Sequence, residues 1–397
     1  MRTAKWILPI IVISQIFCVS LWFASNGVMS DLIIHFDLKE SALGHLTSAV
    51  QFGFITGTLI FALFTIADRF SPSKVFFISA MIGALFNMGS ILESNNLTSF
   101  LMFRFFTGFF LAGIYPIGMK IAADYYEKGL GRSLGFLVGA LVLGTAFPHL
   151  LKDLTDLFPW RFVLIITSGL AALGGLLMLL FVPDGPYRKQ SQGMDYSTIF
   201  KVFKNREFRS AAFGYFGHMW EVYAFWAFVP VMLTTYNGLH PEAQLNTPLL
   251  SFLIIGSGGL SCVLGGYLSQ SFGLKSTAAL ALFLSCVCCV FSPLFFLIDS
   301  SQIFIGILIF WGMVVIADSP LFSTMVANNT LAQSKGTALT IVNSIGFSIT
   351  IISIQLLNNL NDLMDPKYIY TLLALGPILG LIALYKKKNN QLSPASD

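Results

Sequence analysis

The chain has 397 residues, of which 55% are hydrophobic and only 11% charged, and its mean hydropathy is +0.77. This composition excludes a soluble globular protein, since such chains carry about 25% charged residues. The net charge of +4 matters here through its distribution rather than its total, and we expect no nucleic-acid partner. The chain is predicted to be an all-α, multi-pass membrane protein.

Apolar runs of about 20 residues recur along the chain, and each is long enough to cross the hydrocarbon layer as an α-helix. The twelve predicted spans are 6–30, 42–66, 75–92, 99–122, 132–151, 161–182, 209–235, 248–269, 276–297, 303–327, 337–357 and 368–385. The first run is longer than the apolar core of a signal peptide and has no A-x-A-like site near its end. We therefore expect it to be retained as a membrane helix.

The charges between the spans predict the orientation. With twelve spans both termini lie on one side, and most of the 23 lysines and arginines fall in segments on that side. The positive-inside rule then places both termini in the cytoplasm. The longest connection, 184–208, is a basic cytoplasmic linker between an N-terminal six-helix bundle (1–183) and a C-terminal six-helix bundle (209–388), and a flexible tail (389–397) follows.

The two halves of the sequence resemble each other. The segment 67–74, ADRFSPSK, follows the second span, and 269–275, SQSFGLK, follows the eighth. Pro116 in the fourth span corresponds to Pro320 in the tenth. Such a repeat indicates duplicated bundles around a central site at their interface.

The segment 67–74 resembles the cytoplasmic motif of the major facilitator superfamily, usually G-x-x-x-D-R-x-G-R/K, although neither glycine is present. The resemblance covers nearly the whole chain and implies the fold of that superfamily, with two pseudo-symmetric bundles. It also implies that Asp68, Arg69 and Lys74 form charge contacts that hold one access state and break in the other. We group the basic residue Arg132 with this conformational gate.

Other segments carry the same resemblance. RFFTG, beginning at Arg104, is similar to the R-x-x-x-G motif that relatives use in proton coupling. The fifth span lacks the G-P-x-x-G-G core of the antiporter signature, which favours symport. LWFASNG, GHMWEVYAFW and ADSPLFS are similar to a bacterial nitrate/nitrite-transporter-like subgroup. Nitrate carriers use arginines in the second and eighth helices, and both are missing here, so nitrate is not expected as the substrate.

Glu221 is the leading functional candidate because it lies about halfway along the seventh span. An ionisable side chain near the bilayer centre costs about 2.5–3.5 kcal/mol, so it usually faces a water-filled cavity or a partner and marks a solute or proton path. His218 lies one turn earlier and Gly217 four residues earlier, so we expect a pocket shared by Glu221 and His218 beneath a close helix contact. Trp220 and Tyr223 flank this pocket.

Three more side chains complete the predicted solute and proton pathway. Asp318 precedes Pro320, which frees the carbonyl group of Ile316 and so provides polar backbone beside the carboxylate. Arg104 lies within two turns of the outer end of the fourth span, where it either faces the pathway or snorkels to the interface. His149 in the fifth span is a weaker candidate of the same kind.

Together these residues predict a secondary active transporter of the bacterial inner membrane. We expect symport of a small organic anion or zwitterion with protons, where Glu221 binds and releases the proton. The main alternative is a proton-coupled exporter of drugs, siderophores or other amphipathic compounds. A membrane enzyme would require a catalytic cluster, which the scattered histidines do not form, and a binding or sensor protein would bind solute without moving it.

The remaining expectations concern partners. The five cysteines lie inside predicted spans and indicate neither a disulfide framework nor a metal site. We therefore expect no metal and no cofactor. The expected partners are a small-molecule substrate, protons and the lipid bilayer, and the chain is expected to be a monomer.

Overall fold

The computed structural model describes residues 6–126, 130–155, 157–188, 202–331 and 335–385. In these residues every regular element is a helix, which confirms the all-α prediction. Nine helices of the described part are long and apolar enough to cross a membrane. With α6, α12 and the interrupted first span, they account for the twelve membrane spans expected from the sequence.

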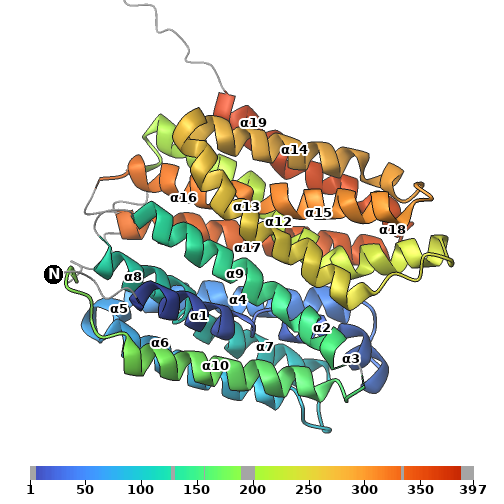
Figure 1. Ribbon diagram of the computed structural model, residues 1–397, viewed down its shortest axis with the longest axis horizontal. Coiled ribbons are helices and arrows are strands. Elements are labelled where there is room, and N and C mark those ends of the chain that lie inside the picture. The colour runs from blue at the N-terminus through green and yellow to red at the C-terminus, as the bar shows by residue number, and fades with distance from the viewer. Residues whose placement is uncertain (1–5, 127–129, 156, 189–201, 332–334, 386–397) are drawn as a thin grey trace, which may run out of the picture.

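The helices form two halves, which Figure 1 shows as two layers, one above the other. The N-terminal half comprises α1 (Ile7–Val19), α2 (Ala24–Gly27), α3 (Met29–His35), α4 (Ala42–Leu63), α5 (Ile66–Arg69), α6 (Pro72–Gly89), α7 (Leu97–Leu111), α8 (Tyr115–Tyr125), α9 (Leu130–Leu154) and α10 (Arg161–Phe181). The C-terminal half comprises α12 (Arg206–Leu239), α13 (Thr247–Phe272), α14 (Leu274–Phe295), α15 (Ser301–Ala317), α16 (Ser319–Asn328), α17 (Lys335–Asn361), α18 (Pro366–Ile369), the 3-10 helix η2 (Tyr370–Ala374) and α19 (Leu375–Tyr385). Helix α12 begins before the predicted residue 209 because Asn205 caps its N-terminus.

Three spans are broken inside the membrane. The fourth span breaks just before Pro116 and the tenth at Asp318, just before Pro320, because proline lacks the N–H group that would continue the helix. The carbonyl group of Ile316, which we expected to be free, accepts the backbone N–H of Asp318 and the thiol of Cys262, the thiol at 3.6 Å. The first span breaks between α1 and α2, which the sequence did not predict.

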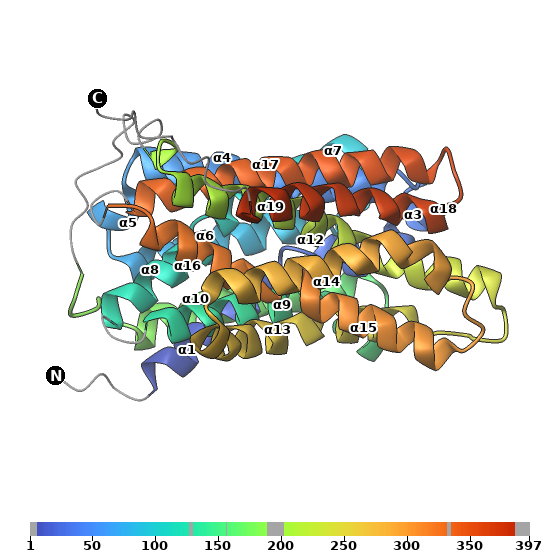
Figure 2. The same ribbon diagram turned by 90° about the horizontal axis from the view of Figure 1, so that it is seen from above.

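Different helices lie at the two ends of the molecule. Figure 2 shows α5 and α8 at one end and α3 and α18 at the other. The first is here called the linker end, because Asp184 and Arg188, which begin the connection between the halves, contact the α5–α6 turn there. The other is called the far end.

The halves meet along two helix pairs, α9 with α13 and α4 with α17. In the first pair the helices approach closely at Gly139 and Gly259. A Cβ atom added to Gly139 would lie 3.2 Å from the carbonyl oxygen of Gly259, so a larger side chain would push the helices apart. Small residues at such contacts are the usual way for membrane helices to pack tightly.

Hydrogen bonds join the halves at the far end. Asn358 of α17 accepts the backbone N–H of Gly44 at 3.1 Å and donates to the carbonyl group of Ser41 at 3.2 Å. Asn246 donates to the carboxylate of Asp153 at 2.6 Å. These contacts, here called the far-end latch, hold the bundles together at that end.

Candidate functional site

Arg104 lies in α7 with its side chain fully buried, so the snorkelling alternative is wrong. Its guanidinium group donates to the carbonyl oxygens of Leu21, at 3.0 Å, and of Trp22, and it approaches the amide oxygen of Asn87 at 3.4 Å. Those carbonyl groups lie in the break between α1 and α2, where the regular helix bonds end. The arginine therefore stabilises the break by supplying the missing donors.

Glu221 points into the C-terminal half. Its Oε1 atom accepts hydrogen bonds from the hydroxyl group of Ser285, the thiol of Cys289 at 3.2 Å and the indole N–H of Trp311 at 2.7 Å. The residue is only 1% exposed, so the water-facing position expected from the sequence is not its position in this structure. Its three donors supply the partners that a buried carboxyl group requires.

His218 contacts Asp318 rather than Glu221, so the expected shared pocket is wrong. The Nδ1 atom of His218 lies 2.8 Å from Oδ1 of Asp318, and both side chains are buried. Residues three apart on a helix point about 60° away from each other. His218 therefore contacts the α15–α16 junction while Glu221 turns toward α14 and α15. In the part of the chain that the structure describes, the outer atoms of the pair, Nε2 and Oδ2, have no hydrogen-bond partner.

Trp220 and Tyr223, the two aromatic residues predicted to flank the pocket, lie in different places. The indole N–H of Trp220 donates to the carbonyl group of Leu372 at 3.1 Å, so this residue packs within the C-terminal half. Tyr223 instead lies between the halves, where its ring centroid is 5.7 Å from that of Trp22 and 5.2 Å from that of Phe347. Tyr223 is thus the flanking residue that lies at the centre of the molecule.

His149 lies near the far end of α9 and is buried, with 2% of its surface exposed. Its Nε2 atom has no hydrogen-bond partner among the described residues. The preceding Pro148 packs against Gly27, where an added Cβ atom would lie 2.9 Å from the proline carbonyl group. His149 therefore belongs to a tight contact of the N-terminal half, apart from Glu221 and Asp318 in the other half.

The predicted gate residues are only partly described. Arg69 at the end of α5 and Lys74 in the first turn of α6 are exposed at the linker end. The side chains of Asp68 and Arg132 lie outside the described residues. The gate therefore stays a prediction.

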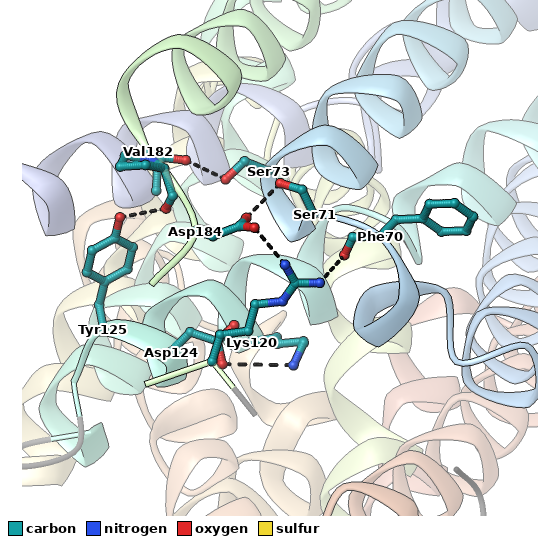
Figure 3. A network of polar contacts seen from close by, with 10 residues as sticks. Phe70, Ser71, Ser73, Lys120, Asp124, Tyr125, Val182 and Asp184 are labelled. Atoms are coloured by element: carbon teal, nitrogen blue, oxygen red, sulfur yellow. Dashed lines mark hydrogen bonds and ion pairs between the residues drawn. The ribbon is translucent and has the colours of Figure 1, made fainter. Parts of the chain in front are cut away.

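A polar network joins the linker to the same turn (Figure 3). Arg188 donates to the carboxylate of Asp184 at 2.6 Å and to the carbonyl group of Phe70 at 2.8 Å. Ser71 donates to the other oxygen of Asp184 at 2.6 Å. Arg188 lies in the predicted basic linker, and Asp184 was not singled out from the sequence. Neither residue lies in a helix, so their four-residue spacing gave no helical ion-pair signal.

The sequence can now be compared with known proteins. The model of the Major Facilitator Superfamily matches residues 11–354. The chain belongs to this superfamily. The match covers both halves, in agreement with the two bundles and the broken spans described above.

Two curated superfamily relatives match part of the chain. The niacin transporter NiaP of Acinetobacter baylyi is 30% identical over 173 residues, which cover 40% of this chain and 36% of the relative. The 4-hydroxybenzoate transporter PcaK of the same organism is 23% identical over 191 residues, which cover 45% of this chain and 39% of the relative. The chain thus spans less than half the length of these relatives.

Two solved transporter structures share the fold over nearly the whole chain. The proton:xylose symporter XylE superimposes with a TM-score of 0.72 at 13% identity, covering 96% of this chain and 94% of the symporter. The nucleoside transporter NupG superimposes with a TM-score of 0.71 at 14% identity, covering 95% and 98%. At such low identity these similarities establish the fold alone.

Sequence reasoning missed four central residues of this superfamily member. Trp22 and Phe347 contact Tyr223 between the halves, and Phe54 contacts Trp22 and Phe347. Gln51 lies on the same face of α4 as Phe54. The available signal was Gln51, whose side chain is the single amide in the second span. The aromatic residues gave no signal, because the chain has 39 phenylalanines and most of them are ordinary packing residues.

Proposed function

We propose that the chain is a secondary active transporter that moves a small organic solute, an anion or a zwitterion, together with protons across the bacterial inner membrane. In this proposal the chain acts as a monomer in the bilayer, without enzymatic activity, and both termini face the cytoplasm. The supporting observation is that the C-terminal half buries Glu221, His218 and Asp318 inside its membrane spans, each with a polar partner. Intramembrane ionisable groups usually mark solute or proton paths.

Glu221 is proposed as the proton carrier. A carboxyl group held by several donors can exist in both protonation states, and burial makes the neutral form accessible. The donors Ser285 and Trp311 lie on α14 and α15, so a movement of either helix changes how well the ionised form is bound. This links proton binding to the shape of the C-terminal half.

The far-end latch is proposed to close one side of the transport path. Two-state gates of this kind need only a few kcal/mol of bias between their states. A hydrogen bond contributes about 0.5–1.5 kcal/mol, and of the latch bonds the one from Gly44 to Asn358 is buried, so it is expected to supply most of this bias. Rocking of the halves breaks these bonds and exposes the interface to the far side.

Proteoliposome uptake tests proton coupling. A thermal-shift screen of metabolites first identifies a solute, and its uptake is then measured with and without an imposed pH gradient. Glu221→Gln keeps the size and the acceptor oxygen of the side chain but cannot release a proton. We expect this variant to bind the solute and to lose the response to the gradient, whereas Glu207→Gln, which changes an exposed residue of the same helix, keeps it. A wild-type response in Glu221→Gln would remove the residue from this role.

A second experiment tests the latch. Asn358→Ala removes the bonds to Ser41 and Gly44, so the closed arrangement loses stability and solute binding from the linker side should weaken. Asn359→Ala changes the exposed neighbour in the same helix and is the matched control. Equal binding and uptake rates in both variants would show that the latch does not gate transport.

Export remains the second candidate because the interface between the halves is aromatic and apolar. A multidrug transporter, MdfA of Edwardsiella ictaluri, is 24% identical over 202 residues. Vesicles of the two orientations, given the same solute and opposite pH gradients, distinguish the directions. Accumulation that follows inward proton flow supports symport, and accumulation against it supports export.

A further inference from the structure

Four aromatic side chains fill the centre of the interface between the two halves. Trp22 and Phe54 come from the N-terminal half, and Tyr223 and Phe347 from the C-terminal half. The ring centroids of Trp22 and Phe54 are 4.7 Å apart, those of Trp22 and Phe347 5.6 Å, and those of Phe54 and Phe347 4.6 Å. All four are buried. In this set, here called the central ring cluster, Trp22 and Phe347 stack across the interface with 26° between their ring planes, and the other pairs are tilted.

The polar atoms around this cluster are unpaired. The indole N–H groups of Trp22 and Trp226 and the hydroxyl group of Tyr223 have no hydrogen-bond partner among the described residues. Trp226 belongs to the same place, since its ring centroid is 5.1 Å from that of Tyr223. Buried indole and phenol groups usually have a partner, and elsewhere in this chain Trp220 and Trp311 have one. Unpaired buried groups also occur elsewhere in the described residues, but these three lie beside the central ring cluster.

Gln51 adds an amide to the same place. It lies four residues after Thr47 and three before Phe54, so the three side chains share one face of α4. The ring of Phe54 contacts that of Phe347 in the other half, with centroids 4.6 Å apart, which shows that this face points toward the interface. The side chain of Gln51 is fully buried, and neither of its amide atoms has a partner in the described part of the chain.

Donors outnumber acceptors in this unpaired set. The excess comes from the two indole nitrogens, which only donate, whereas the amide of Gln51 and the hydroxyl group of Tyr223 can both donate and accept. Arg104 lies directly behind the cluster, since its guanidinium group binds the backbone carbonyl of Trp22. Within the described residues no acidic side chain pairs with this cation. A buried charge acts over longer distances than an exposed one, so the site favours an anionic ligand that is rich in acceptors.

We propose that the central ring cluster binds a flat aromatic carboxylate as the transported solute. The ring lies between the aromatic side chains of the two halves, and the carboxylate accepts hydrogen bonds from Gln51 and Trp22. This inference rests on the proposed transport function and specifies its solute class. In this structure the rings contact one another, so the solute enters when the halves separate and replaces contacts between them. A solute bound there contacts both halves at once.

Calorimetric titration of the full chain in nanodiscs tests this solute class with three matched probes. Benzoate has the ring and the charge, benzamide keeps the ring without the charge, and cyclohexanecarboxylate keeps the charge without the flat ring. We expect benzoate to bind at least fivefold more tightly than either of the other two. Equal affinities for benzoate and cyclohexanecarboxylate, or no measurable binding of benzoate, would overturn the proposal. If benzoate does not bind, the unpaired groups bind only water.

Two variants locate the bound carboxylate. Gln51→Leu removes the amide at similar volume, and Trp22→Phe keeps an aromatic ring but removes the N–H group. We expect benzoate affinity to fall about tenfold in each, and we expect the fall for benzamide to be smaller. The controls Gln270→Leu and Trp6→Phe change exposed residues outside the cluster and should leave affinity unchanged. Unchanged benzoate affinity in both cluster variants, or an equal loss in the controls, would overturn the assignment.

Uptake separates this inference from the transport function itself. If benzoate binds as expected but proteoliposomes do not accumulate it, the solute class stands and the transport proposal fails. If another solute accumulates with a pH gradient while benzoate does not compete with it, transport stands and the aromatic carboxylate class fails.

Discussion

The two halves of the molecule hold their buried charges in different ways. In the N-terminal half Arg104 binds backbone carbonyl groups at a helix break. In the C-terminal half Glu221, His218 and Asp318 bind side chains. An arginine does not lose its proton in proteins, whereas carboxyl and imidazole groups exchange protons. The difference teaches that a buried charge in a membrane span is not by itself a transport residue, because its partners decide whether it is structural or exchangeable.

Arg104→Met tests the structural side of this comparison and should have the largest effect. It leaves the carbonyl groups of Leu21 and Trp22 without donors, which we expect to cost about 3 kcal/mol of stability, because each buried acceptor that loses its donor costs about 1–3 kcal/mol. Thermal unfolding in nanodiscs measures the loss. Arg104→Lys keeps the charge but not the forked geometry of the guanidinium group. Its melting temperature should lie between those of the wild type and Arg104→Met. Wild-type melting of Arg104→Met would mean that the break does not depend on this residue.

Trp311→Phe tests the exchangeable side. It removes one donor from Glu221, and a hydrogen bond to a charged group is worth about 1.5–3 kcal/mol. Because a charge-assisted bond is stronger than a neutral one, the loss should grow as rising pH ionises the carboxyl group. Melting at pH 5 and pH 8, with Trp6→Phe as control, measures this trend. A loss that is independent of pH would show that Glu221 keeps one protonation state throughout.

A double-mutant cycle on His218 and Asp318 sharpens the comparison further. The pair is in contact at 2.8 Å, so we expect a coupling of about 1 kcal/mol between His218→Gln and Asp318→Asn. The cycle uses melting temperatures of the two single variants, the double variant and the wild type. Additive effects would mean that the two groups do not stabilise each other and that proton exchange at one is not felt by the other.

Asp184→Asn should have the smallest effect, because its ion pair with Arg188 is partly exposed. Such pairs contribute about 0.2–1 kcal/mol and weaken with salt. We expect a small decrease in melting temperature that disappears in concentrated salt, with Asp362→Asn, an exposed change at the far end, as control. A large decrease in melting temperature that persists in concentrated salt would show that the Asp184–Arg188 pair behaves as a buried interaction.

Much of the architecture was predictable from composition and periodicity. Twelve apolar runs and the repeat of 67–74 at 269–275 indicated the fold, because a chain in lipid must satisfy its backbone within helices. Pro320 marked one helix break for a similar local reason, and Pro116, its counterpart in the repeat, lies at another. The break at Leu21 and Trp22 was not predictable, because the donor that satisfies it, Arg104, lies far away in the chain.

Sequence alone determined which buried residues are ionisable, because an isolated charge in an apolar run is visible without neighbours. Only the tertiary structure decided what each one contacts. His218 and Glu221 are three residues apart on one helix, yet the rotation between them turns one toward Asp318 and the other toward Trp311. The central ring cluster likewise exists only because two halves meet, and no local pattern in either half contains it.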